Sequence, residues 1–201
     1  MNFLAHSLLA FGDDELLVGQ FAGDFVRGAD LSAHTAKVAD GIRLHRHVDS
    51  FTDRHPGLRD LRAMFPDSLR RFSGIAIDVA ADYHLVQGWS RYVVSLDVGT
   101  LAEHGREVDQ VLAARRAQLP EGLKRFADVM RERQLLVSWG TRKGVEQTLA
   151  RLSRRSARFA PLAECAEQLW RLEEETSEFV DALWPDLLSS TLKMRDDLNN
   201  T

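Results

Sequence analysis

The sequence contains a single cysteine, Cys165, among its 201 residues. One thiol excludes a disulfide within the chain, and an unpaired cysteine indicates a reducing compartment. Cys165 lies in the segment AECAEQLW, whose apolar spacing is helical. We therefore interpret it as a packed residue rather than as a nucleophile.

Long hydrophobic runs are also absent. No stretch approaches the roughly 20 apolar residues that a membrane-spanning helix needs, so we expect no membrane partner. The first residues, MNFLAHSLLAFGDDE, carry no basic region and soon become acidic, which argues against a signal peptide. The cytoplasm is the expected location.

The chain has no excess of positive charge, since its formal net charge is −4. Non-specific nucleic-acid binding needs a broad basic surface, so we expect no nucleic-acid partner. Hydrophobic residues make up 44% of the chain and charged residues 28%, which is an ordinary balance for a globular domain.

Turn-forming residues are scarce, with only five prolines, and alternating strand-like patterns are rare. Apolar residues recur instead at spacings of three and four, which predicts an all-α, single-domain helical bundle over residues 1–198 and a frayed C-terminus at 199–201. Ser32 and Asp97 are expected helix caps, and Pro185 is expected to kink or break the last segment. The expected helices cover residues 2–11, 14–27, 32–54, 57–64, 74–92, 98–118, 121–138, 143–156 and 160–198.

The segment LHRHVDSFTD, residues 44–53, combines imidazoles and carboxylates with core-type residues. On a helix, Val38, Ile42, His45 and Asp49 share one stripe, because residues three and four apart lie on the same face. The stripe starts apolar, so its polar end is also expected to face inward. A buried carboxylate must be protonated, paired with arginine or bound to a metal.

A second segment, GIAIDVAADYHL, places Asp78 and Asp82 four residues apart on a helix that is apolar nearly all round. Two like charges at this spacing repel each other. They either share a cation or belong to an Asp–Arg network with Arg43, Arg46 or Arg70.

Two further polar residues lie in apolar helical surroundings, His6 in NFLAHSLLAF and Asp24 in GQFAGDFVRG. A mixed set of imidazoles and carboxylates suits Mn²⁺, Mg²⁺, Fe²⁺ or Zn²⁺, and the excess of carboxylates favours Mn²⁺ or Mg²⁺. Such a centre can activate water and bind a phosphoryl group. The combined set is His6, Asp24, His45, Asp49, Asp78 and Asp82.

This set resembles, loosely, the helical HD-type phosphohydrolases, although the literal His-Asp dipeptide is absent. Four blocks, MNFLAH, GQFAGDFVRG, GIRLHRHVDSFTDRHP and IAIDVAADYHL, more closely resemble the acyl carrier protein phosphodiesterase family. The likeness is dense over about the first 90 residues. One departure is visible, because the family pattern has a histidine directly after the second aspartate, where this chain has Tyr83 and then His84.

The resemblance implies an HD-like, all-α, cytoplasmic hydrolase that converts the holo-acyl carrier protein of fatty acid biosynthesis into apo-protein and 4′-phosphopantetheine, with Mn²⁺ as cofactor and Mg²⁺ or Fe²⁺ as alternatives. It implies that Asp24, His45, Asp49 and Asp78 are metal ligands, and that Asp82 is a ligand or orients one. His6 is then a ligand or a proton donor, while Arg27 and Arg46 neutralise the phosphate or pair with the same aspartates.

An acidic carrier protein needs a basic docking surface. Residues 142–158 hold six basic residues and one acidic residue, whereas residues 164–181 hold seven acidic residues and one basic residue. This asymmetry can steer an acidic partner, although a solvated helix face would look the same. Two other functions stay open, a hydrolase of a small nucleotide or other diester and a non-catalytic carrier-binding module. The candidate docking residues are Arg142, Lys143, Arg151, Arg154, Arg155 and Arg158.

Overall fold

The computed structural model describes residues 1–200, which contain helices and no strand. The all-α prediction is confirmed. The first half holds α1 (Phe3–Leu8), α2 (Asp14–Ala22), the 3₁₀ turn η1 (Gly23–Phe25), α3 (Ala36–Arg54), α4 (Pro56–Ala63), α5 (Asp67–Gln87) and α6 (Trp89–Tyr92). The second half holds α7 (Leu101–Ala114), η2 (Arg116–Gln118), α8 (Glu121–Glu132), α9 (Leu135–Ser138), α10 (Arg142–Ser153), η3 (Ala157–Ala163), α11 (Cys165–Arg171) and α12 (Glu173–Asn199).

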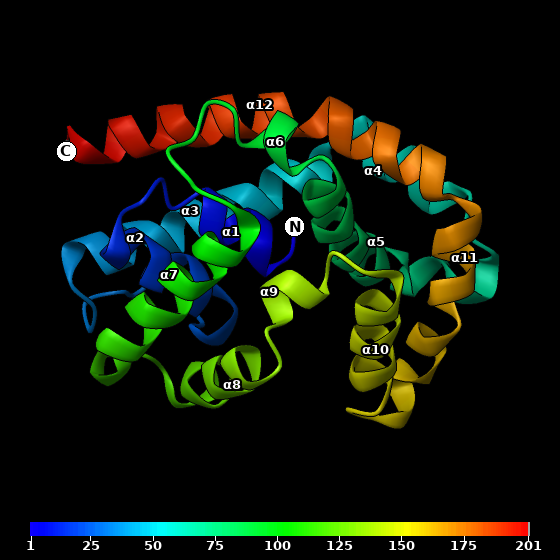
Figure 1. Cartoon of the computed structure of the whole chain (residues 1–201), viewed down its shortest axis with the longest axis horizontal. Coiled ribbons are helices and arrows are strands. Elements are labelled where there is room, and N and C mark those ends of the chain that lie inside the picture. Colours follow the sequence, from blue (N-terminus) through cyan, green and yellow to red (C-terminus); the bar gives the residue numbers. More distant parts are fainter. Residues whose placement is uncertain (201) are drawn as a thin grey trace.

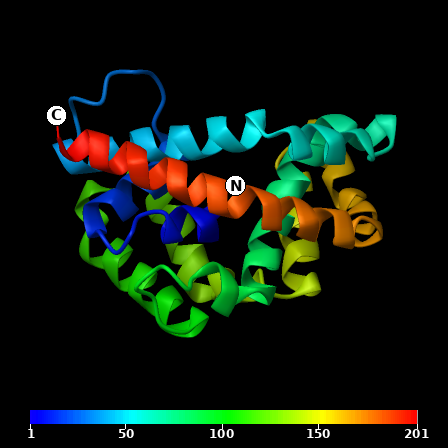
Figure 2. The same cartoon turned by 90° about the horizontal axis from the view of Figure 1, so that it is seen from above.

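Helix α5 is central, since it contacts α1, α4, α10, α11 and α12. Long helix α12 runs along α3, α4 and α5, and Figure 2 shows α12 and α3 side by side. Helices α7 to α9 form an arc below α1 and α2, while α10 and α11 close the opposite end (Figure 1). The buried apolar side chains of all these parts form one connected core.

Helices α2 and α3 cross with their backbones in close contact. A Cβ atom on Gly19 would lie 2.3 Å from the carbonyl oxygen of Val38 and 2.6 Å from Cα of Gly41. Only residues without a side chain permit this approach of two backbones. The crossing brings η1, which directly follows α2, against the second half of α3.

Several predicted boundaries were wrong. Thr35 caps α3 instead of Ser32, and Thr100 caps α7 with a capping box instead of Asp97. Helix α5 begins seven residues before the predicted start at 74, directly after Pro66. The predicted helix 160–198 is interrupted at Leu172, between α11 and α12. Helix α12 then continues through Pro185, where the break was expected.

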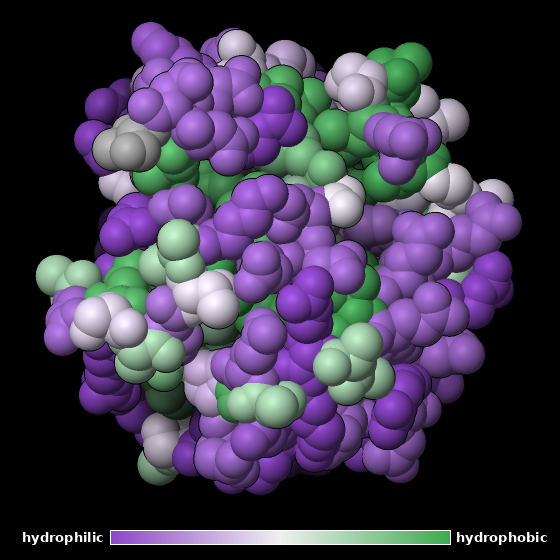
Figure 3. All heavy atoms as spheres, turned by 90° about the vertical axis from the view of Figure 1, so that its left-hand side faces the viewer, coloured by the Kyte–Doolittle hydropathy of each residue, from purple (hydrophilic) through white to green (hydrophobic). Residues whose placement is uncertain are grey.

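The C-terminal part of α12 extends through Asn199, and Asn200 donates a hydrogen bond from its side chain to the carbonyl oxygen of Asp196. The predicted fraying of residue 201 lies outside the described residues. None of the described helices is long and apolar enough to cross a membrane. The face at the α2 and α7 end is largely polar, with apolar side chains visible in its hollows (Figure 3).

Candidate active site

The site centres on three side chains from two helices. His45 and Asp49 lie one turn apart on α3, with His45 Nε2 at 3.1 Å from Asp49 Oδ2. His6 comes from α1, and its Nε2 lies 3.2 Å from Asp49 Oδ1. The two imidazole rings stack with their centroids 4.2 Å apart. The structure therefore brings together the predicted imidazoles and the predicted carboxylate of α3.

Asp24 reaches the same group from η1. Its Oδ1 lies 3.6 Å from His45 Nε2. This approach depends on Gly23, where a Cβ atom would lie only 2.2 Å from the His45 ring. The sequence block GQFAGDFVRG therefore provides the Asp24 carboxylate and, at Gly23, the absence of a side chain that lets η1 approach His45.

The two aspartates of α5 have separate surroundings. Asp78 faces the cluster, where the Met1 amino group lies 3.1 Å from Asp78 Oδ1 and 3.8 Å from Asp49 Oδ1. Asp82 is fully buried and accepts hydrogen bonds from the backbone amides of Leu4, at 2.8 Å, and Ala5, at 3.2 Å. Both Asp82 oxygens are thus used to hold the first turn of α1, which carries His6.

The alternative of an Asp–Arg network around Asp78 and Asp82 is wrong. Arg43 pairs with Asp40, and Arg70 pairs with Asp67. Arg46 donates to the carbonyl oxygens of Val26, at 3.3 Å, and Gly28, at 2.7 Å, and so holds the loop after η1.

Gln20 is a member of the site that the sequence reasoning missed. Its Nε2 donates to the carbonyl oxygen of Leu9 at 3.1 Å, so its Oε1 is left to face His6 Nδ1 at 2.9 Å. Oε1 can only accept, so Nδ1 of His6 carries the proton and Nε2 presents a lone pair to Asp49. The signal in the sequence was a glutamine inside the apolar segment LLVGQFA.

The electrostatics of the cluster depend on burial and on pairing. Burial opposes the positive charge of His45, but the carboxylates of Asp24 and Asp49 outweigh it and raise the His45 pKa to about 9. Burial lowers the pKa of His6, and the nearby His45 lowers it further. Burial also acts to raise the pKa of Asp49, but the hydrogen bond from His45 and the charge of the Met1 amino group hold the Asp49 pKa far below its usual range.

On α5, burial is the main cause of the opposite shift. It raises the pKa of Asp78, against the influence of the Met1 amino group. Burial likewise raises the pKa of Asp82 to about 7, although the amides of Leu4 and Ala5 stabilise its charged form. Carboxylates with such different proton affinities, gathered within one site, are typical of functional centres.

A divalent cation fits this donor set. His6, His45 and Asp49 each offer a ligand atom, and these atoms lie within 4.8 Å of one another. His6 Nε2 is buried without a hydrogen-bond partner, and its lone pair faces an oxygen of Asp49. The lone pairs of His6 Nε2 and Asp49 Oδ1 repel each other at this distance. A cation between the two atoms would be coordinated by both, which removes the repulsion.

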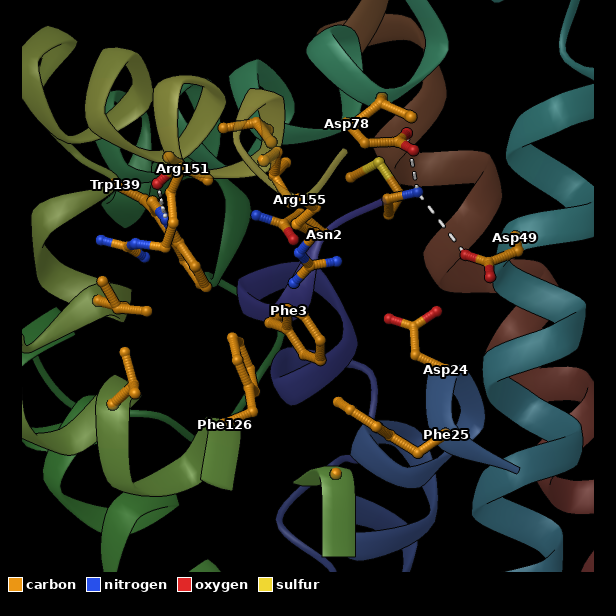
Figure 4. Close-up of a pocket in the computed structure, with 18 of the residues that line it drawn as sticks. Asn2, Phe3, Asp24, Phe25, Asp49, Asp78, Phe126, Trp139, Arg151 and Arg155 are labelled. Carbon is orange, nitrogen blue, oxygen red and sulfur yellow. Dashed lines mark hydrogen bonds and ion pairs between the residues drawn. The ribbon is translucent and has the colours of Figure 1, made fainter. Parts of the chain in front are cut away.

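Asp49 of the cluster lines one end of a cavity of about 630 Å³, together with Asp24 and Asp78, whereas His6 and His45 lie behind this wall. In Figure 4, Asp24, Asp49 and Asp78 turn toward one side of this space, whereas Phe126, Trp139 and Arg151 lie on the other side. The charged and aromatic residues of its wall are four aspartates, Asp24, Asp49, Asp53 and Asp78, three arginines, Arg125, Arg151 and Arg155, and the rings of Phe3, Phe25, Phe126 and Trp139.

The predicted phosphate-neutralising arginines lie elsewhere. Arg27 is exposed and does not line the cavity, and Arg46 is engaged by the loop carbonyls. Arg125 of α8 lines the cavity in their place, and sequence reasoning missed it because α8 is far from the site in the chain.

The predicted docking residues divide into three groups. Arg151 and Arg155 line the cavity, whereas Arg142 forms an ion pair with Glu173 and lies over the Trp170 ring. Exposed residues that do not line the cavity are Lys143, Arg154 and Arg158.

Tyr83 and His84, where the family pattern is altered, are also outside the cavity wall. Tyr83 donates a hydrogen bond to Glu173, and burial lowers the pKa of His84 to about 4. The buried Cys165 lies close to the carbonyl oxygen of Pro161, at 3.6 Å, in agreement with a packed residue.

Fold and site together define a helical protein with a His/Asp cluster that could hold a metal ion at one end of a ligand-sized cavity. The chain belongs to the acyl carrier protein phosphodiesterase family of phosphoric diester hydrolases, whose sequence pattern matches residues 1–187. This confirms the resemblance seen in the sequence.

Individual relatives agree with the family assignment. A protein of Pectobacterium atrosepticum named acyl carrier protein phosphodiesterase is 30% identical over 185 residues, which is 92% of each chain. A protein of the same name from Photorhabdus laumondii is 29% identical over 185 residues, which cover 92% of this chain and 90% of the relative. A third, from an Enterobacter species, is 40% identical over 91 residues, 45% of this chain and 47% of the relative. No solved structure matches the chain.

Proposed function

We propose that this protein hydrolyses holo-acyl carrier protein to apo-acyl carrier protein and 4′-phosphopantetheine on an HD-like helical scaffold, with Mn²⁺ as the cofactor. The observation that carries the proposal is the cluster of His6, His45 and Asp49 at the end of a ligand-sized cavity. It occurs in a chain whose relatives are named for this reaction.

The cation would be held by His6, His45, Asp49 and Asp24, with Asp78 completing the set from α5. When bound, it supplies an activated water and neutralises phosphate charge. In the reaction, a water oxygen bonds to phosphorus, the bond from phosphorus to the serine oxygen breaks, and the serine oxygen takes up a proton. The proton that the attacking water gives up balances the proton that the serine oxygen takes up.

Residues outside the ligand set hold this arrangement in place. Gln20 fixes the His6 tautomer, and Asp82 anchors the first turn of α1. Partners of this kind keep ligands correctly oriented, and their loss typically reduces metal affinity 10- to 100-fold. Asp82 therefore acts as a supporting carboxylate in this proposal, and the residues in direct contact with the cation come from α1, η1, α3 and α5.

The carrier protein would approach over the α8 and α10 side of the cavity. Arg125 and Arg155 line the cavity and are exposed, and neither forms an ion pair within residues 1–200. Unpaired guanidinium groups attract an acidic partner and accelerate its association at low salt. Arg154 lies next to Arg155 and is also exposed, so it extends the same surface.

The test is to incubate metal-stripped protein with holo-acyl carrier protein, with and without Mn²⁺, and to measure the intact mass of the carrier. Loss of the phosphopantetheine mass only with Mn²⁺ is the expected result. Cation binding without this loss would favour a hydrolase of a small diester, and neither binding nor loss would favour a non-catalytic carrier-binding module.

Two sets of variants separate chemistry from docking. Asp49→Ala and Asp78→Ala are expected to abolish turnover while helical content is kept, with the exposed Asp60→Ala as the matched control; near-normal turnover in both would exclude the ligand assignment. Arg155→Glu is expected to lower turnover and its dependence on salt, with the exposed Arg59→Glu as control. An unchanged salt dependence would show that docking uses another surface.

A further inference from the structure

Most of the residues that line the cavity are not carboxylates. Its other wall comes from α1, α8, α9 and α10, and its total volume is about 630 Å³. A phosphate group and a cation need only a small part of this space, whereas cavities of roughly 300–1,000 Å³ typically hold an organic ligand. The remaining volume therefore needs an occupant of its own.

The wall of this remote part carries aromatic and aliphatic side chains beside three arginines, Arg125, Arg151 and Arg155. The centroid of the Phe3 ring lies 4.5 Å from that of the Phe126 ring and 6.3 Å from that of the Trp139 ring, with which it is stacked. Val129 of α8 and Leu152 of α10 add aliphatic surface to the same wall. Such a surface favours an occupant with uncharged, partly apolar segments.

The polar groups that face this part of the cavity with no partner are hydrogen-bond donors. Asn2 lines the cavity, and its Nδ2 is buried without a hydrogen-bond partner. Arg151 is half-buried and has no ion pair within residues 1–200, and burial with the nearby Arg133 and Arg155 lowers its pKa. Unpaired donors of this kind call for a ligand rich in acceptor oxygens.

We propose that this aromatic part of the cavity binds the pantetheine chain of the substrate, in continuity with the phosphate at the carboxylate end. The inference rests on the proposed function, which places the reacting phosphodiester beside His6, His45 and Asp49. A pantetheine chain is uncharged, alternates short apolar segments with two amides, and is joined at one end to the phosphate of the substrate. Its methyl groups match the aromatic wall, and its carbonyl oxygens match the free donors.

The experiment fills this part of the cavity from α8. Val129→Trp places an indole in the space beside Phe126, and Leu152→Trp does the same from α10 if the first variant fails to fold. Glu132→Trp is the matched control, because Glu132 is on α8, exposed and outside the cavity wall. Circular dichroism checks that each variant is folded.

Two measurements are made on every variant. The first is the ratio of turnover of holo-acyl carrier protein to turnover of methyl 4-nitrophenyl phosphate, a small diester with no chain to place. The second is the binding of free pantetheine by calorimetry, which needs no catalysis. Val129→Trp is expected to lower the turnover ratio at least tenfold and to weaken pantetheine binding at least tenfold, while Glu132→Trp changes both less than twofold.

The outcomes separate the proposed reaction from the proposed pantetheine site. If the wild type does not cleave holo-acyl carrier protein but binds pantetheine, and Val129→Trp loses that binding, the reaction is wrong and the cavity assignment stands. An unchanged turnover ratio in folded Val129→Trp or Leu152→Trp overturns the cavity assignment. Saturable binding of a mononucleotide such as AMP in place of pantetheine overturns it as well.

Discussion

Gln20 provides a sharp test of the proposed cation centre, because it touches the centre only through His6. Replacing Gln20 with leucine keeps the size of the side chain and removes both hydrogen bonds of the amide. The carbonyl oxygen of Leu9 then loses its donor, and His6 Nδ1–H loses its acceptor. Both groups are in the core, where an unsatisfied polar group costs about 1–3 kcal/mol.

His6 can avoid its share of this cost by moving its proton to Nε2, where Asp49 Oδ1 lies 3.2 Å away. That change removes the lone pair that the cation would need. We therefore expect Gln20→Leu to lower the free energy of unfolding by about 1–3 kcal/mol, from the Leu9 carbonyl. We also expect Mn²⁺ affinity to fall about 10- to 100-fold, as for other residues that orient a metal ligand.

The assays are urea unfolding, calorimetric titration with Mn²⁺, and ¹⁵N NMR of the histidine side chains to identify the His6 tautomer. Gln20→Glu is the control, because a carboxylate still accepts from His6 Nδ1–H. We expect this variant to keep Mn²⁺ affinity within about threefold, as in the carboxylate–histidine pairs of other metal sites. The reasoning is refuted if Gln20→Leu binds Mn²⁺ as tightly as the wild type, or if wild-type His6 carries its proton on Nε2.

Three further predictions concern packing and pH. Gly19→Ala is expected to lower the free energy of unfolding, measured by urea denaturation, by more than about 2 kcal/mol, because the new Cβ would lie 2.6 Å from Cα of Gly41. Helix propensity alone predicts a gain in stability, and such a gain would contradict this expectation. Burial lowers the pKa of His104 from 6.5 to about 4, so the folded state binds fewer protons than the unfolded state between these values and stability falls as pH falls. Between pH 7 and 5 the wild type is expected to lose about 2 kcal/mol more than His104→Gln, which keeps a donor for Ser7, and equal losses would exclude this role. Since the His45 pKa is about 9 and a ligand must be deprotonated, Mn²⁺ affinity is expected to rise about tenfold per pH unit from pH 6 to 8, and a flat titration profile would show that His45 is not a ligand.

The local pattern of the sequence was enough to predict the helices and part of the site. The four-residue spacing of His45 and Asp49 places them on one face of α3, and this follows from helix geometry alone. The same rule failed for Asp78 and Asp82, which do share a face of α5 but meet different partners. Asp82 meets the backbone amides of α1, and no rule of local spacing indicates a partner 78 residues away.

Other failures have similar physical causes. By residue type Ser32 is at least as good a cap as Thr35, but Thr35 lies against α2, where its hydroxyl donates a hydrogen bond to Glu15. The sequence alone does not distinguish Arg46 from Arg125, because arginine usually lies at the surface. Only the tertiary structure shows that Arg46 binds loop carbonyls and that Arg125 lines the cavity. Residue chemistry therefore identified candidates, and long-range packing assigned their roles.

The bond between Asp82 and the Leu4 amide has a thermodynamic consequence for the whole chain. This hydrogen bond closes a loop of 78 residues and holds the first turn of α1, the helix that carries His6. A partly folded chain in which α1 is not docked has no complete cluster, so a cation bound there would select the fully folded state. At a free concentration 100 times its dissociation constant, such a ligand adds about 2.7 kcal/mol to global stability. The supply of the metal in the cell would then govern the lifetime of the protein as well as its turnover.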